Sequence, residues 1–180
     1  MLSLEKINQI TDPKVRRQLK LDILNRANKK TQGVLRNDFL SFVKKIWPEF
    51  IEGNHHKTIA DSFNRILKGE LKRLIINMPP RHTKSEFASY FLPAWMIGNK
   101  PDLKIIQATH TAELAIRFGR KAKTLIDSQE YQDLFTTRLR EDSKAAGRWE
   151  TNKGGEYFAV GVQGAVTGRG ADLLIIDDPH

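Results

Sequence analysis

The chain contains no cysteine, which excludes disulfide bonds and thiolate metal sites and fits a reducing compartment. No apolar run approaches the roughly 20 residues that a membrane-spanning helix needs. The polar, charged start does not match a secretory signal. The five histidines follow no metal-ligand spacing, and no internal repeat or low-complexity segment occurs. These absences favour a globular protein without a membrane partner.

What is present is enough for one ordinary domain: 180 residues, of which 39% are hydrophobic and 28% charged. The net charge of +9 is uneven, because residues 1–80 hold 16 Lys and Arg against 8 Asp and Glu, whereas residues 81–180 hold 14 against 13. A basic end on a near-neutral body indicates a polyanionic partner such as nucleic acid. A solvated basic helix face gives the same pattern, so both interpretations stand. The basic residues are densest over positions 14–30, at Lys14, Arg16, Arg17, Lys20, Arg26, Lys29 and Lys30.

Residues 71–86 have the order of parts of a phosphate-binding loop. The apolar run 71–78 predicts a buried strand, residues 79–83 a tight turn, and Lys84 with Ser85 the start of a helix whose N–H groups face an anion. The two glycines usual in such a loop are replaced by Met78 and Thr83, and glycine is favoured there for its tolerance of positive φ. A plain turn between strand and helix explains the same residues.

A second motif follows about ninety residues later, where the apolar run 173–176 ends in Asp177 and Asp178. This pattern is typical of a buried parallel strand, and an acidic residue at its carboxyl end lies where doubly wound sheets bind ligands. In P-loop NTPases such a carboxylate helps to hold Mg²⁺, and the next one can polarise the attacking water. A strand that ends in a solvated turn before Pro179 is the alternative.

The remaining chain predicts an α/β fold with a largely parallel sheet flanked by helices. We expect a helical segment over 3–30 in two pieces, divided near Asp12 and Pro13 and broken at Gly33, with a thin apolar stripe every four residues from Val15. The other predicted elements are helices over 37–47 and 55–68, a helix from Lys84 kinked at Pro93, a strand over 104–109, a helix capped by Thr111, a polar helix or loop over 128–147, a hairpin of 148–152 with 156–162, and a mobile glycine-rich loop over 161–170.

With these motifs laid out, the chain resembles the N-terminal ATPase domain of the large terminase subunit of tailed phages, the motor that packages DNA. The resemblance covers about residues 42–179. Its blocks are residues 47–50 with His55 and His56, residues 75–86 (including MPPRHTKSE), residues 107–115, and residues 161–179 (including TGRGADLLIIDDP). It implies a P-loop NTPase-like domain over 37–180 behind a basic helical extension over 1–36.

The resemblance also implies roles for single residues. Lys84 contacts the β- and γ-phosphates of ATP, Ser85 and Asp177 hold Mg²⁺, and Asp178 stands where many relatives carry a catalytic Glu. Because Asp is shorter than Glu by one methylene group, the Asp178 carboxylate reaches roughly 1.5 Å less far. The implied nucleotide-binding set is Pro80, Arg81, His82, Thr83, Lys84, Ser85, Glu86 and Asp177, and the implied catalytic set is Asp178, Arg81 and Arg169.

Some roles stay open at this stage. Arg81 can add positive charge at the γ-phosphate, and Arg169 either acts as an arginine finger into a neighbouring subunit or pairs with Asp172. His55 and His56 either approach the adenine or lie at an exposed helix start. Thr83, β-branched in place of the last loop glycine, is expected to weaken nucleotide binding or to impose a different turn.

The chain ends two residues after the paired aspartates, whereas the resemblance implies further ATPase strands and a nuclease domain. We therefore expect a fragment, doubtful as an ATPase by itself, with open strand edges that favour aggregation or pairing. For the complete protein the resemblance implies homo-oligomers, duplex DNA, the small terminase subunit and the portal as partners, and the host cytoplasm as location. A helicase is a weaker alternative, and a catalytically silent remnant that uses residues 1–45 to bind DNA or a protein partner is the third.

Overall fold

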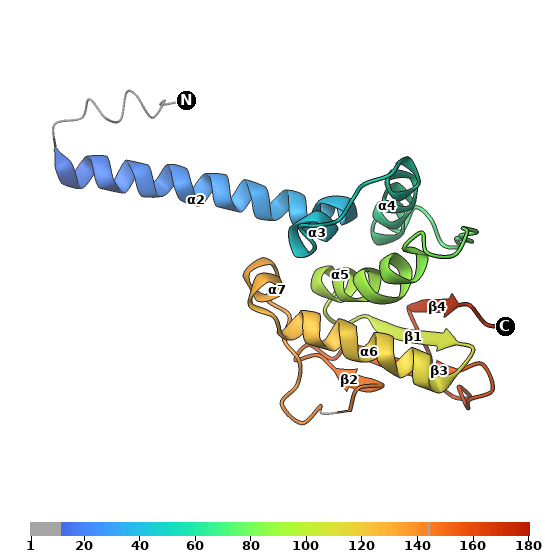
Figure 1. Cartoon of the computed structure of the whole chain (residues 1–180). Coiled ribbons are helices and arrows are strands. Elements are labelled where there is room, and N and C mark those ends of the chain that lie inside the picture. Colours follow the sequence, from blue (N-terminus) through green and yellow to red (C-terminus); the bar gives the residue numbers. More distant parts are fainter. Residues whose placement is uncertain (1–11, 144) are drawn as a thin grey trace.

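The computed structural model describes residues 12–143 and 145–180 (Figure 1), so the predicted helical piece before residue 12 lies outside the described residues. In chain order the elements are α2 (Pro13–Asn37), α3 (Phe39–Ile46), α4 (Asn54–Leu67), the π-helix η1 (Glu86–Phe91), α5 (Leu92–Asn99), β1 (Lys104–Thr109), α6 (Ala112–Asp127), α7 (Gln129–Leu134), β2 (Arg148–Glu150), β3 (Glu156–Gly161) and β4 (Leu173–Asp177). No helix in this part of the chain combines the length and the apolar character of a membrane span.

The helix α2 begins where the sequence predicts. Asp12 caps it by accepting from the backbone N–H groups of Lys14 and Val15, and Pro13 occupies the first turn, where its missing N–H is not needed. The predicted break at Gly33 is wrong, because α2 continues to Asn37. One glycine costs a helix only about 1 kcal/mol relative to alanine, which neighbouring contacts can offset.

Asp38 joins α2, α3 and α4 at one point. It is both the C-cap of α2 and the N-cap of α3. As the N-cap, its Oδ2 accepts from the Ser41 N–H at 2.8 Å. Asn64 of α4 donates to Asp38 Oδ1 at 2.9 Å and accepts from the Phe39 N–H at 2.8 Å. Burial raises the pKa of the Asp38 carboxyl, but the hydrogen bonds from Ser41 and Asn64 outweigh burial and hold it below its ordinary value.

The four strands of the described part form one mixed sheet in the order β2-β3-β1-β4. The central strand β1 pairs in parallel with β3 and with β4, so that Thr109 lies between Gly161 and Asp177 at the carboxyl ends. The strand β2 pairs antiparallel with β3 and completes the predicted hairpin. The α/β class is therefore confirmed, with two parallel strand pairs and one antiparallel pair.

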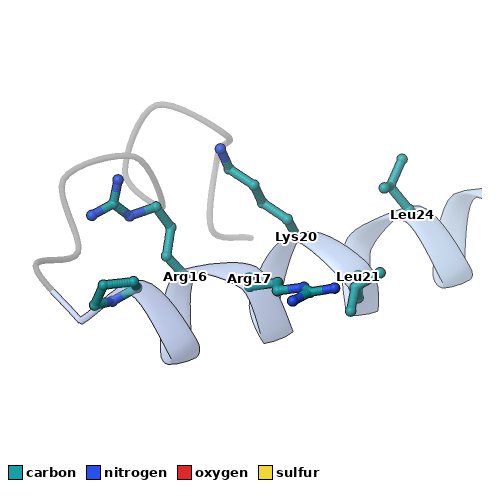
Figure 2. Close-up of a pocket in the computed structure, with 6 residues that line it drawn as sticks. Arg16, Arg17, Lys20, Leu21 and Leu24 are labelled. Atoms are coloured by element: carbon teal, nitrogen blue, oxygen red, sulfur yellow. The ribbon is translucent and has the colours of Figure 1, made fainter.

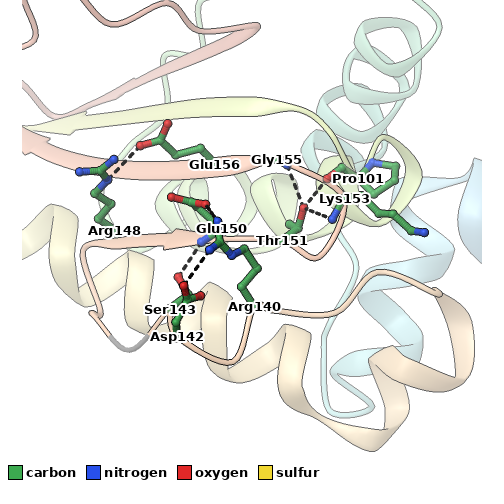
Figure 3. Close-up of polar contacts among 10 residues, drawn as sticks. All are labelled: Pro101, Arg140, Asp142, Ser143, Arg148, Glu150, Thr151, Lys153, Gly155 and Glu156. Carbon is green, nitrogen blue, oxygen red and sulfur yellow. Dashed lines mark hydrogen bonds and ion pairs between the residues drawn. The ribbon is translucent and has the colours of Figure 1, made fainter.

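Polar contacts fix this hairpin and its flanking loops (Figure 3). The Thr151 hydroxyl donates to Pro101 O at 2.6 Å and accepts from the Gly155 N–H at 2.9 Å. Arg140 bonds Asp142 and Glu150 across the loop before β2. Gly154 has φ +88°, a conformation that favours glycine, as the predicted turn at residues 153–155 requires.

Helices cover one face of the sheet. On this face Trp149 Nε1 donates to Gly119 O of α6, and Ser89 of η1 donates to Asp177 of β4. Ile105, Tyr157 and Ile175 of the same face belong to the buried core. On the other face Leu174 and Ile176 of β4 are 57% and 60% exposed. Within the described residues β4 has β1 as its single strand neighbour.

The strand predicted over residues 71–78 is wrong, since no strand forms there. Its side chains do alternate: Leu74, Ile76 and Met78 pack against the core, whereas Ile75 is 86% exposed. The backbone of residues 72–79, however, makes no backbone hydrogen bond to any described residue. Periodicity reports which side chains are buried, but a strand also needs a neighbouring strand.

The helix after the loop is irregular where Pro93 predicts a kink. A π-helix occupies Glu86–Phe91, and α5 starts at Leu92 with Pro93 in its first turn. Proline cannot donate to the carbonyl four residues back, and its ring crowds that carbonyl. A wider π turn just before Pro93 accommodates both effects without ending the helix.

Candidate functional site

The two sequence motifs meet at the carboxyl end of β4. Lys84 Nζ lies 4.0 Å from Asp177 Oδ1, with side chains that are 31% and 4% exposed. Lys84 stands in the first helical turn after the loop, and Asp177 is the last residue of its strand. Residues 93 positions apart in the chain thus place an ammonium group and a carboxylate at one sheet edge, the place where α/β sheets bind ligands.

A chain of hydrogen bonds holds the Asp177 carboxylate from behind. The Ser89 hydroxyl donates to Asp177 Oδ2 at 2.8 Å, and Gln107 Nε2 donates to Ser89 Oγ at 3.0 Å. Both Ser89 and Gln107 are fully buried. Because Oδ2 is occupied in this way, Oδ1 is the oxygen left for Lys84 or a cation. The sequence motifs do not indicate Ser89, although it follows Ser85 by four residues and therefore lies on the same helix face.

The loop offers unpaired backbone donors beside Lys84. The N–H groups of Thr83, Lys84, Ser85 and Glu86 donate to no residue that the structure describes. Arg81 and Thr83 both adopt left-handed backbone conformations, with φ of 63° and 62°. Turns of this kind gather successive N–H groups into a concavity, and a helix N-terminus adds partial positive charge. Together they form a suitable cradle for an anion.

Thr83 is held in this strained conformation by His56. The Gly53 N–H donates to His56 Nδ1 at 2.8 Å, so Nδ1 is an acceptor and the ring proton is on Nε2. His56 Nε2, 2.7 Å from Thr83 Oγ1, therefore donates to the hydroxyl, and the hydroxyl donates to His82 O at 2.6 Å. Burial, followed by the neighbouring His55, lowers the pKa of His56, which favours this neutral ring.

The other residues of the predicted nucleotide-binding set lie on the loop or just after it. His82 Nδ1 donates to Pro80 O at 2.9 Å, and Arg81 is exposed with no ion pair to a described residue. Ser85 follows Lys84 in the same turn, and its hydroxyl makes no hydrogen bond inside the described chain. Glu86 points elsewhere, since both its carboxylate oxygens bond Lys121 of α6 at 2.7 and 2.6 Å.

The structure does not bring every predicted catalytic residue to this point. Asp178 is exposed, has φ 49°, and its backbone O accepts from the His110 N–H; no described contact joins its carboxylate to Lys84. Arg169 bonds Glu156 at 2.9 Å and lies over the Phe158 ring. Because Glu156 pairs with Lys104 at the start of the parallel strands, Arg169 is at the opposite end of the sheet from Asp177, and Asp172 accepts from the Lys104 N–H instead.

The donor set can be tested for Mg²⁺ and nucleotide phosphates. No cluster of three or more His, Asp or Glu side chains suited to a metal occurs in the described segments. Magnesium bound to a nucleotide needs few protein ligands, because phosphate oxygens and water supply the rest. One positioned carboxylate at Asp177, a nearby Ser85 hydroxyl and free N–H groups therefore fit a phosphate-bound magnesium ion, and they do not fit a metal held by protein side chains alone.

Comparison of this chain with protein-family models, with curated proteins and with solved structures finds no match.

Proposed function

We propose that this chain binds ATP with Mg²⁺ at the Lys84–Asp177 site. The observation that carries the proposal is the 4.0 Å approach of Lys84 Nζ to Asp177 Oδ1, beside four N–H groups at a helix start that donate to no described residue. In this arrangement Lys84 binds the β- and γ-phosphates, Ser85 and Asp177 hold the magnesium ion, and the loop N–H groups from Thr83 onward bind phosphate oxygens. Bound magnesium neutralises charge that develops on the phosphates.

The reaction that fits this site best is ATP hydrolysis in a DNA-packaging motor of the terminase type. Arg81, exposed on the loop, supplies positive charge toward the γ-phosphate. Asp178, which directly follows Asp177 at the end of β4, is the carboxylate that activates water. Arg169 lies at the opposite strand ends, so an arginine-finger role requires the site of a neighbouring subunit. Duplex DNA, a small terminase subunit, the portal and the host cytoplasm belong to this proposal as parts of the resemblance.

The test combines nucleotide binding with turnover. We expect a fluorescent ATP analogue to bind in the presence of Mg²⁺, and Lys84→Ala to lower the affinity at least about tenfold because a charge-assisted contact is lost. Lys121→Ala is the matched control, since it removes a lysine beside the site that holds Glu86 rather than phosphate. Phosphate release stimulated by duplex DNA and abolished by Lys84→Ala supports the motor, whereas equal binding by parent and Lys84→Ala contradicts the site.

A second function, a catalytically silent module that binds DNA or a protein partner, is favoured by α2, a helix without a single buried residue. This alternative is supported if the chain binds DNA but not ATP and if Lys84→Ala leaves the DNA affinity unchanged. Phosphate release that duplex DNA stimulates and Lys84→Ala abolishes excludes it.

A further inference from the structure

The helix α2 carries most of the net positive charge of the whole protein. Between Pro13 and Asn37 it holds eight Lys and Arg and a single acid, Asp22, in a chain whose net charge is +9. The Asp22 carboxylate accepts from the Gln18 amide at 3.1 Å and pairs with no lysine or arginine in the described residues. The helix is thus a concentrated positive surface that its own side chains do not neutralise.

This helix extends away from the body of the molecule (Figure 1), and among the described residues its carboxyl end makes the hydrogen bonds to that body. Gln32 donates to Asp133 O at 3.0 Å, Arg36 donates to Leu134 O at 2.5 Å, and Asn99 donates to Arg36 O at 2.9 Å. These contacts tie the last two turns to α7 and α5. A rigid arm anchored at one end presents the rest of its length to a partner.

The basic side chains lie on all sides of α2. Arg17 and Arg26 are nine residues apart, which is two and a half turns, and so they lie on opposite sides of the helix. Arg17, Arg26, Lys29 and Lys30 are all exposed and form no ion pair with another described residue. Figure 2 shows Arg16, Arg17 and Lys20 around a surface pocket near the start of the helix, next to Leu21 and Leu24.

The exposed apolar side chains of α2 do not form a continuous face. The predicted apolar stripe that starts at Val15 is interrupted by charge, because Arg26 lies 11 residues, about three turns, after Val15 and so on the same side. The exposed Leu24 lies nine residues after Val15, on the opposite side, and the exposed Leu21 neighbours Leu24. A helix that binds in a protein groove or on a membrane surface needs one apolar face opposite a polar one. A basic helix that lacks a continuous apolar face is suited to a partner with regularly spaced negative charges.

We infer that α2 is a nucleic-acid-binding arm whose lysine and arginine side chains contact the phosphate backbone of duplex DNA. The inference rests on the proposed function for the choice of duplex DNA and on α2 for the contact surface. A 25-residue helix is about 38 Å long, close to one turn of duplex, about 34 Å. The amides of Gln18, Asn25, Asn28 and Gln32 share one face of α2, but Gln18 bonds Asp22 and Gln32 bonds Asp133 O. The basic side chains lie on all sides of the helix, so phosphate contacts supply the binding.

The test measures salt-dependent binding of the full chain to a fluorescein-labelled 30-base-pair duplex. The variant replaces Arg17, Arg26, Lys29 and Lys30 with Gln; the matched control replaces the exposed body lysines Lys68, Lys72, Lys100 and Lys153 with Gln, the same loss of charge. We expect the arm variant to bind at least about tenfold more weakly, with a slope of log K against log salt shallower by about 3 to 4, because each phosphate contact contributes about 0.9.

Failure of this inference can be distinguished from failure of the proposed function. The arm variant is expected to retain the binding of ATP with Mg²⁺, and Lys84→Ala to retain the DNA affinity. Equal losses in the arm variant and the body control overturn the inference, because net charge alone then explains binding. Stronger α2-dependent binding to vesicles of phosphatidylserine and phosphatidylcholine than to the duplex, at the same salt, also overturns it.

Discussion

His56 Nε2 lies 2.7 Å from Thr83 Oγ1 and supports Thr83, which stands where a phosphate-binding loop usually has its last glycine. Thr83 has φ 62°, a conformation that costs a side chain with a Cβ about 1 to 2 kcal/mol. A hydrogen bond of net value about 1 kcal/mol offsets part of this cost. Thr83 therefore adopts the left-handed backbone conformation usual for glycine, and the hydrogen bond from His56 of α4 stabilises it there.

Replacing Thr83 with Gly tests whether this side chain weakens nucleotide binding. We expect Thr83→Gly to bind ATP with Mg²⁺ more tightly, by a few-fold, because glycine adopts positive φ without strain and removes bulk beside the phosphates. Isothermal titration of parent and variant measures the difference. Thr83→Ser, which keeps the hydroxyl that His56 contacts, is the control and should match the parent. Equal affinities for parent and Thr83→Gly contradict this account.

The His56–Thr83 contact also makes the loop sensitive to pH. Burial and His55 lower the pKa of His56, so the unfolded chain binds a proton at a higher pH than the folded one. The contribution of His56 to stability is complete above its ordinary pKa of about 6.5 and decreases as the pH falls below that value toward the lowered folded pKa. Protonation also removes the Nδ1 acceptor for the Gly53 N–H.

Thermal unfolding of the parent and of His56→Gln between pH 7.5 and pH 5 measures this effect. We expect the melting temperature of the parent to fall over this interval more than that of His56→Gln, whose amide does not titrate. Parallel curves for the two proteins mean that His56 does not contribute to the acid sensitivity.

Asp38 is expected to be a stability determinant of the helical half. Its carboxylate caps α3 and binds Asn64 of α4, so Asp38→Ala should lower the free energy of unfolding by about 1 to 2 kcal/mol. Because hydrogen bonds hold its pKa below the ordinary value, this contribution is present above about pH 4 and is lost as the pH falls through the folded pKa.

Urea titration of Asp38→Ala at pH 7 measures the capping contribution. Asp22→Ala on α2 is the control, because that carboxylate bonds a glutamine of its own helix and caps nothing. A loss for Asp38→Ala no larger than for Asp22→Ala contradicts the capping role.

The open side of β4 is expected to cause self-association. Leu174 and Ile176 expose apolar surface on a strand with one described neighbour, and such edges pair with other chains. Ile176→Lys should reduce the concentration-dependent increase in mass seen by light scattering. Ile51→Lys, at an 87% exposed loop position, is the control and should leave self-association unchanged. Equal effects of both substitutions point to general hydrophobicity rather than to the strand.

The sequence predicted what depends on nearby residues. The cap at Asp12, the cap at Thr111 and the hairpin around Gly154 are set within a few positions of the chain, and the structure has all three. It did not predict what depends on distant partners. Residues 71–78 have the alternation of a strand but no strand beside them, and Ser89 reaches Asp177 across 88 positions. Of the site, Lys84 and Asp177 converge as the motifs indicate, while Arg169 joins Glu156 at the far strand ends.

The central claim is that the loop N–H groups, Lys84 and Asp177 form one phosphate site, and amide NMR spectra of the ¹⁵N-labelled chain test it most directly. On addition of ATP with Mg²⁺, we predict large shift changes for the amides of residues 81–86 and 177, absent in Lys84→Ala and much smaller with AMP, which lacks the β- and γ-phosphates. Unchanged amides at these positions, or changes confined to another part of the molecule, would contradict the account.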